Sequence, residues 1–297
     1  MRFVTVAVVV LLSSVSSLVL RKTYRFQDEG YQDDIARNKI YPMSAAAYGD
    51  DPSKCVDSVF GKGAEIIGTT TIKCDFSGDP CFAFIVASHV DQAIIISFRG
   101  TEDVNEVRVI LDKANFYHEK FIAGGRACSF FINTYTGLWE AGFKDHYFTA
   151  KNKYPHYQIW VTGHNTGGSI ASVFSAFLIY SNYTTSDELL MVTMGQPRTG
   201  NYDYAQIHDK LVKNSYRVVH SRDVIAHLPA LHWQKYYHHG HEIWFDNDMK
   251  DGDHKECTKG EDSACSDSGS LTWNILDDYY YYHVEKPVNK WGIDGCQ

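Results

Sequence analysis

The 297-residue chain is 44% hydrophobic and 22% charged, which is the composition of a globular protein with a sizeable buried core rather than a disordered one. The length suits one large domain or two small ones. With a formal charge of -8 and no basic stripe, the sequence argues against nucleic acid and anionic membrane surfaces as electrostatic partners.

The N-terminal segment, residues 1–17, is predicted to be a secretory signal peptide. Arg2 supplies the positive charge, residues 3–12 the apolar stretch and residues 13–17 a small-residue exit. This stretch is shorter than the roughly 20 apolar residues that span a bilayer, although an anchor that stays attached is the alternative. No other run is long and apolar enough, so we expect a secreted, extracellular protein without a transmembrane segment.

Seven cysteines suit an oxidising compartment. The favoured pairs are Cys74 with Cys81, Cys257 with Cys265, and Cys55 with Cys296, which leaves Cys128 outside the pairing. Other connectivities stay open. A glycosylation sequon begins at Asn182, on a loop expected after a helix.

Alternating strand and helix patterns predict one α/β domain over residues 18–297. Continuous apolar runs at 93–98, 158–162, 189–194 and 216–220 are typical of buried strands. Helical spacing covers 138–153, which stops before Pro155, and also 168–180 and 201–213. We therefore expect a mostly parallel sheet with helices on both faces.

The stretch VTGHNTGG, residues 161–168, has the outline of a nucleophile elbow. A short apolar strand leads into a glycine-rich turn and then a long helix, whose free N–H groups suit a developing oxyanion. A serine hydrolase would carry serine where this chain carries Asn165. An ordinary strand-to-helix turn is the alternative interpretation.

Further motifs make the elbow more specific. FRGT ends the strand at 93–98, GQPRTGN follows the strand at 189–194, Asp223 follows the next strand, and HHGHEIWF lies at 238–245. Taken in order from Tyr41 to Cys296, this set resembles the fungal-type (class 3) lipase family, especially its secreted animal members. The resemblance implies an α/β-hydrolase fold, a Ser–Asp–His triad acting on glycerolipid esters, no cofactor, and the three disulfides favoured above.

The triad of that family maps onto this chain incompletely. Asp223 fits the acid, and Thr101 and the N–H of Thr166 fit the oxyanion donors. Asn165 stands at the nucleophile position, and its delocalised amide nitrogen cannot form an acyl-enzyme. The family closes with an Asp-His-x-x-Tyr-Phe pattern, which places Asp278 at the histidine position. A shifted register would instead recruit His283 as the base.

Three routes to activity stay open at this stage. Thr166 would need its side chain to face the pocket, and Ser169 lies one helical turn further on. Asn165 would need deamidation to give a carboxylate nucleophile.

Residues 102–121 occupy the family's lid position and carry apolar residues at helical spacing, so an amphipathic lid and a packed surface helix are both possible.

The histidines at 238–241 raise the question of a metal site. Alternation along a strand would place His239 and His241 on one face, but the resemblance puts this stretch in a structural strand, so we predict no metal there. The leading hypothesis is a secreted lipase-like protein that has lost ester hydrolysis and binds a lipid or acyl ester, with contact to a lipid–water interface. An active triacylglycerol lipase or carboxylesterase using His283, and an interaction protein with a vestigial cleft, are the alternatives.

Overall fold

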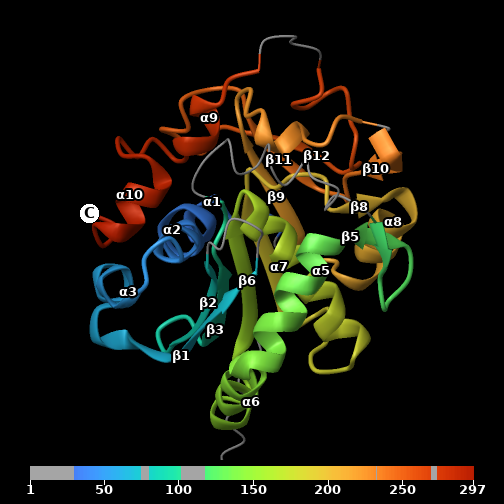
Figure 1. Cartoon of the computed structure of the whole chain (residues 1–297). Coiled ribbons are helices and arrows are strands. Elements are labelled where there is room, and N and C mark those ends of the chain that lie inside the picture. Colours follow the sequence, from blue (N-terminus) through green and yellow to red (C-terminus); the bar gives the residue numbers. More distant parts are fainter. Residues whose placement is uncertain (1–29, 75–79, 102–117, 232, 269–272) are drawn as a thin grey trace, which may run out of the picture.

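The computed structural model describes residues 30–74, 80–101, 118–231, 233–268 and 273–297. Its main element is an eight-stranded sheet in the order β1-β2-β3-β6-β7-β9-β11-β12 (Figure 1). The strands are β1 (Ala64–Lys73), β2 (Pro80–Ser88), β3 (Ala93–Phe98), β6 (Gln158–His164), β7 (Leu189–Met194), β9 (Ser215–His220), β11 (Glu242–Phe245) and β12 (Lys255–Cys257).

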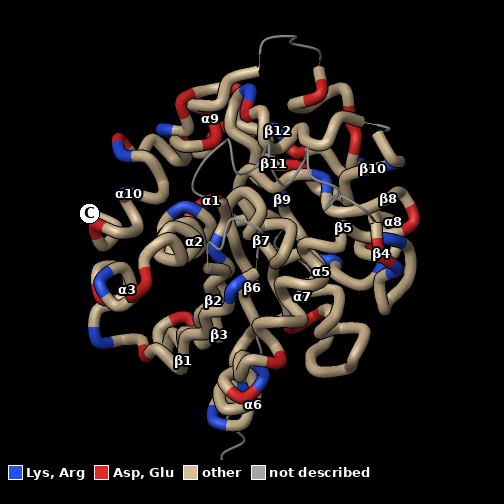
Figure 2. The backbone as a smooth tube through the Cα atoms, in the orientation of Figure 1, with Lys and Arg blue, Asp and Glu red and all other residues tan. Residues whose placement is uncertain are grey.

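The centre of this sheet is parallel. Strands β3, β6, β7, β9 and β11 pair in parallel, while β1 and β2 form an antiparallel edge and β12 closes the other edge in the antiparallel sense. The central strands β3, β6 and β7 contain no charged residue, because both of their faces are covered. Figure 2 shows charges of both signs spread around the periphery instead.

Helices cover the two faces of the sheet. In Figure 1, α2, α3 and α10 lie on one side, and α5, α6 and α7 lie on the other. A small second sheet, β10-β8-β5-β4, lies beside α8. The helices are α1 (Asp33–Ile35), α2 (Tyr41–Ala46), α3 (Ser53–Phe60), α5 (Ser129–Leu138), α6 (Lys144–Lys153), α7 (Thr166–Tyr180), α8 (Tyr202–Leu211), α9 (Leu276–Tyr279) and α10 (Val288–Ile293), and the small strands are β4 (His118–Lys120), β5 (Arg126–Cys128), β8 (Gly200–Asn201) and β10 (Tyr236–Tyr237).

Side-chain alternation along the strands builds two cores. Ile94 and Ile96 of β3 pack with α5 and α7, whereas Ile95 packs on the opposite face with α2. The fold prediction is confirmed: one domain, a mostly parallel sheet, and helices on both faces. The strands predicted at 93–98 and 189–194 are reproduced to the residue, and β6 and β9 differ from prediction only at their ends.

The helix predicted over 138–153 is wrong as a single element. Gly142 has φ 114°, outside the helical region, and a π-helical turn at Trp139–Phe143 separates α5 from α6. The stretch 238–241 is not a strand either, because β11 begins at Glu242. His239 is buried while the side chain of His241 is 38% exposed, so the two do not share a face.

The three favoured disulfides are present: Cys55–Cys296, Cys74–Cys81 and Cys257–Cys265. Cys128 is buried and takes part in none of them. Among the described residues, no helix is long and apolar enough to cross a membrane. The predicted signal peptide and residues 102–117 of the predicted lid lie outside the described residues, and residues 118–120 form strand β4.

Candidate active site

The elbow joins β6 to α7 at the centre of the sheet. Asn165 has φ 57° and ψ -130°, a strained conformation that non-glycine residues adopt rarely. The turn is tight: a Cβ at Gly163 would stand 2.3 Å from the carbonyl carbon of Gly167, and a Cβ at Gly167 would stand 2.4 Å from the carbonyl oxygen of Phe98. Glycine at both positions therefore lets α7 start directly against β3 and β6.

The side chain of Asn165 faces the two predicted oxyanion donors, Thr101 and Thr166. Its Oδ1 accepts a hydrogen bond from the Thr166 N–H at 2.6 Å and another from Thr101 Oγ1 at 3.0 Å. The Thr166 N–H can only donate, which fixes the amide oxygen on this side. The side-chain oxygen of Asn165 thus accepts from both groups that were predicted to be oxyanion donors.

The other end of the Asn165 amide contacts a carboxylate. Its Nδ2 donates to Asp278 Oδ2 at 3.1 Å. Asp278 is buried in α9, so the predicted histidine position holds an acid directly against the predicted nucleophile position. Every polar atom of the Asn165 side chain is therefore engaged within the protein, because the amide bridges the oxyanion donors and Asp278.

Asp223 lies beside Asp278 at the carboxyl end of β9. Its Oδ2 and Asp278 Oδ1 converge on Gly195, where they would stand 2.7 and 2.9 Å from an added Cβ. Asp223 accepts hydrogen bonds from the Tyr281 hydroxyl at 2.7 Å and the Ile225 N–H at 2.8 Å. Burial, reinforced by the neighbouring Asp278 charge, raises the pKa of Asp223 to about 8.

His164 is the imidazole nearest to these acids. Its Nε2 donates to the backbone oxygen of Asp278 at 2.7 Å and lies 3.2 Å from Asp278 Oδ1, and its Nδ1 is 2.6 Å from the Tyr48 hydroxyl. Burial opposes a charge on this ring, but the charge of Asp278, its hydrogen bonds and the charge of Asp223 together outweigh burial and raise the pKa of His164. With both nitrogens engaged, the ring has none available for a hydroxyl nucleophile.

The other residues proposed as a base or nucleophile do not join the cluster of Asn165, Asp223 and Asp278. The side chain of His283 is 50% exposed, with Nδ1 3.6 Å from Asp248, and the structure does not bring it to Asp223. Ser169 is buried and donates to the carbonyl of Pro197, and Thr166 Oγ1 accepts from the Thr101 N–H at 3.0 Å. Neither hydroxyl is held by an imidazole in the described structure.

Sequence reasoning placed four of the clustered residues, Thr101, Asn165, Asp223 and Asp278, but missed Tyr48, His164 and Tyr281. His164 lies inside the elbow motif, and Tyr281 lies in the tyrosine run used to place Asp278. Both residues therefore belong to motifs that the sequence analysis had already identified. Their roles depend on contacts with residues more than 50 positions away, which no local pattern encodes. Among the contacts described, no nucleophile–imidazole–acid relay is formed.

Residues 95–233 match the family model described as lipase (class 3). The lipase ZK262.3 of Caenorhabditis elegans is 30% identical over 307 residues, which cover 91% of this chain and 84% of the relative. A secreted mono- and diacylglycerol lipase of Fusarium solani is 28% identical and aligns over 67% of this chain and 59% of its own length. The solved lipase of Rhizopus microsporus var. chinensis superposes with a TM-score of 0.73 at 25% identity, covering 88% of this chain and 90% of that one.

Proposed function

Because the chain belongs to the class 3 lipase family, we propose that it is a secreted, catalytically impaired lipase-like protein that binds a lipid or an acyl ester without cleaving it. The observation that carries this proposal is the Asn165 amide, whose oxygen sits on both oxyanion donors and whose nitrogen is held by Asp278.

Two chemical arguments support the loss of hydrolysis. The amide nitrogen of Asn165 has no lone pair that a base can unmask, so an acyl-enzyme cannot form there. In serine hydrolases, removing one triad member lowers turnover by roughly 10⁴-fold or more, because only the oxyanion site and binding remain. Here Asp278 also stands where the proton-carrying imidazole is expected, and a buried carboxylate is a poor shuttle near neutral pH.

The filled oxyanion position weakens residual catalysis further. An ester carbonyl that polarises against Thr101 and Thr166 must first displace the Asn165 oxygen. That displacement breaks two hydrogen bonds, each with a net value of about 1 kcal/mol. We therefore expect an ester to be held by its acyl and glyceryl groups rather than by its carbonyl.

Exposed apolar side chains close in sequence to the two site acids support lipid binding. Trp273 and Leu276, which are 42% and 57% exposed, lie five and two residues before Asp278, and Leu231 and Trp233 lie eight and ten residues after Asp223. Trp273 stacks on His227 with ring centroids 3.9 Å apart, which anchors it to the segment after Asp223. We call Leu231, Trp233, Trp273 and Leu276 the apolar rim, and we infer that it contacts acyl chains or a lipid–water interface.

Secretion is supported by three disulfides and by the charged-then-apolar pattern of residues 1–17. Asn182 lies exposed after α7, as a glycosylated asparagine would. Mass spectrometry of the protein recovered from culture medium tests both points, since it reads the mature N-terminus and the mass at Asn182. A retained N-terminus starting at Met1 would count against the signal peptide.

Ester hydrolysis by the purified protein tests the loss of activity. The assay compares the unmodified chain, Asn165→Ser, Asp278→His and the double variant on a short-chain nitrophenyl ester and an emulsified triacylglycerol. We expect no turnover from the unmodified chain or either single variant, and turnover about 100-fold above the blank from the double variant, because it rebuilds serine, histidine and acid together.

Asp223→Ala in the double-variant background is the control, since it should remove any activity that depends on the triad acid. Turnover by the unmodified chain that Asp223→Ala abolishes would refute the proposal. Activity restored by Asn165→Ser alone would show that a working imidazole is already present, and that Asp278 does not occupy the histidine position.

A further inference from the structure

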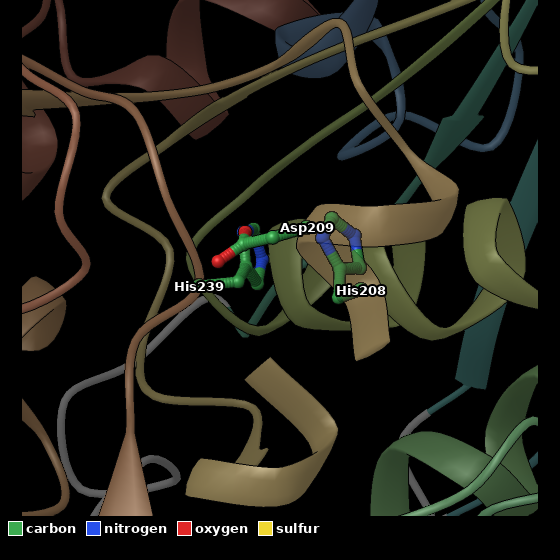
Figure 3. A group of neighbouring side chains, drawn as sticks. All are labelled: His208, Asp209 and His239. Atoms are coloured by element: carbon green, nitrogen blue, oxygen red, sulfur yellow. The ribbon is translucent and has the colours of Figure 1, made fainter. Parts of the chain in front are cut away.

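A second cluster of ligating side chains lies outside the candidate active site. Among the described residues, His208, Asp209 and His239 place one ligand atom each within 4.8 Å of one another. His208 and Asp209 are the consecutive residues near the end of α8, and His239 lies in the segment between β10 and β11 (Figure 3). The cluster therefore joins elements about 30 residues apart in the sequence.

The hydrogen-bonding capacity of the two imidazoles is largely unused. Both are fully buried, and within the described structure neither Nδ1 nor Nε2 of His208 has a hydrogen-bond partner, nor does Nδ1 of His239. A buried polar group without a partner costs about 1–3 kcal/mol. Three such nitrogens in one place are unusual for a folded protein and point to a ligand that accepts one lone pair from each ring.

The charges around the cluster suit a metal cation. The charge of Arg217 is balanced by Glu242, 3.4 Å away, so Asp209 supplies a net negative charge to the cluster.

We propose that His208, Asp209 and His239 form a binding site for one zinc ion, with water completing its coordination. Two imidazoles and a carboxylate are a donor set that zinc favours, typically at about 2.0–2.2 Å in tetrahedral geometry. Such geometry needs the ligand atoms about 3.4 Å apart, so the cluster must contract. The two rings are now stacked, with centroids 3.7 Å apart, and must turn toward a common point.

The rotation of His208 breaks no hydrogen bond of the described structure, because neither of its nitrogens has a partner there. Asp209 is exposed and gives the ion a path from solvent, and its Oδ1 is already oriented by the Gly240 N–H at 2.6 Å. The ion would thus tie α8 to the segment before β11.

Ser172 acts as a positioning residue for His239. Its hydroxyl lies 3.0 Å from His239 Nε2. When Nε2 carries the proton, Ser172 accepts it and the Nδ1 lone pair is available to the ion. This tautomer requires the Gln196 amide, whose nitrogen now lies 2.8 Å from Nε2, to turn so that its oxygen faces the ring. In this tautomer the buried N–H of His239 has a hydrogen-bond acceptor.

Metal titration of the tag-free, full mature protein after chelator treatment tests the proposal. We expect calorimetry to find one Zn²⁺ per chain and Co²⁺ to give the visible absorption bands of a tetrahedral site. His208→Gln and His239→Gln should abolish both signals, and Asp209→Asn should weaken binding at least tenfold. His241→Gln, at a neighbouring exposed histidine, is the matched control and should bind as the unmodified chain does.

Ser172→Ala should weaken Co²⁺ binding about tenfold and shift its absorption bands, as loss of an outer-shell partner does. Asp209 is exposed, so Asp209→Asn keeps the test decisive if a buried histidine variant fails to fold by circular dichroism. The proposal is overturned if the unmodified chain binds neither metal with one-to-one stoichiometry, or if binding is the same in Asp209→Asn and is lost in His241→Gln.

Discussion

Replacing Asp223 by asparagine should change how stability depends on pH. In the folded chain the pKa of this carboxyl is about 8, because burial and then the adjacent Asp278 charge disfavour ionisation. The unfolded value is 3.8. Between these values the folded state holds a proton that the unfolded state releases, so the stability contributed by protonated Asp223 is complete below pH 4 and is lost as pH rises toward 8.

The size of the effect follows from the same two values. One pKa unit corresponds to about 1.4 kcal/mol, and pH 7 lies about three units above the unfolded pKa of 3.8. Ionisation of Asp223 in the unfolded state therefore lowers the free energy of unfolding by up to about 4 kcal/mol at pH 7. Asparagine cannot ionise and escapes this loss. It gives up one of the two hydrogen bonds from Tyr281 and Ile225, a pH-independent cost of about 1 kcal/mol.

Urea unfolding followed by circular dichroism, at steps from pH 4.5 to 7.5, measures the difference between the two chains. We expect the two chains to be about equally stable at pH 4.5, where the ionisation loss and the lost hydrogen bond are each about 1 kcal/mol, and Asp223→Asn to be the more stable chain by about 3 kcal/mol at pH 7. Asp246→Asn, at an exposed aspartate after β11, is the control and should follow the unmodified chain at every pH. A difference between Asp223→Asn and the unmodified chain that stays constant over this range would refute a protonated Asp223.

Two further predictions concern the elbow and the apolar rim. Asn165→Ala should lower the free energy of unfolding by about 2–4 kcal/mol in the same urea assay, because it removes a helix N-cap and leaves the donors of Thr101 and Thr166 buried without an acceptor; an unchanged midpoint would mean that the amide bridge contributes nothing. Trp273→Ser with Leu276→Ser should weaken co-sedimentation with phosphatidylcholine vesicles about tenfold or more, since each exposed apolar side chain that enters lipid contributes about 1.5–3 kcal/mol. Val90→Ser, at a more exposed apolar residue (70%) of the β2–β3 turn beyond the opposite end of β3, should have no effect, and equal losses in the two variants would contradict a localised rim.

Much of the fold could be predicted because the central strands are continuous apolar runs with β-branched residues, a local signal that tertiary context does not reverse. Helix α5 was missed because SFFINTYTGL is rich in weak helix formers, and its helicity depends on packing against α7. The break at Gly142 was missed for the related reason that one glycine is tolerated in many helices, and only its positive φ separates α5 from α6.

The site divides in the same way. The elbow is local, so eight consecutive residues and the family pattern placed Asn165, Thr101 and Thr166. The family pattern also put Asp223 and Asp278 in one triad. The stacking of His208 on His239 joins residues of different elements, and sequence spacing carries no information about it. The prediction of no metal rested on His238, His239 and His241 alone. His208 lies 31 residues before His239, outside that motif.

Under the proposed function, asparagine at position 165 and aspartate at position 278 make physical sense together. A hydrolase keeps its oxyanion donors without a strong partner until the transition state forms, and buried donors held that way cost stability. Asn165 satisfies them permanently with its own oxygen, and asparagine also tolerates the positive φ of the elbow better than most residues. The amide nitrogen of Asn165 then needs a hydrogen-bond acceptor, and the Asp278 carboxylate provides one. A neutral imidazole whose N–H faced the amide would not accept this hydrogen bond. The elbow of this chain is therefore a closed hydrogen-bonded unit, in which the strain that serves catalysis in a hydrolase is retained while the groups that would use it are bonded to one another.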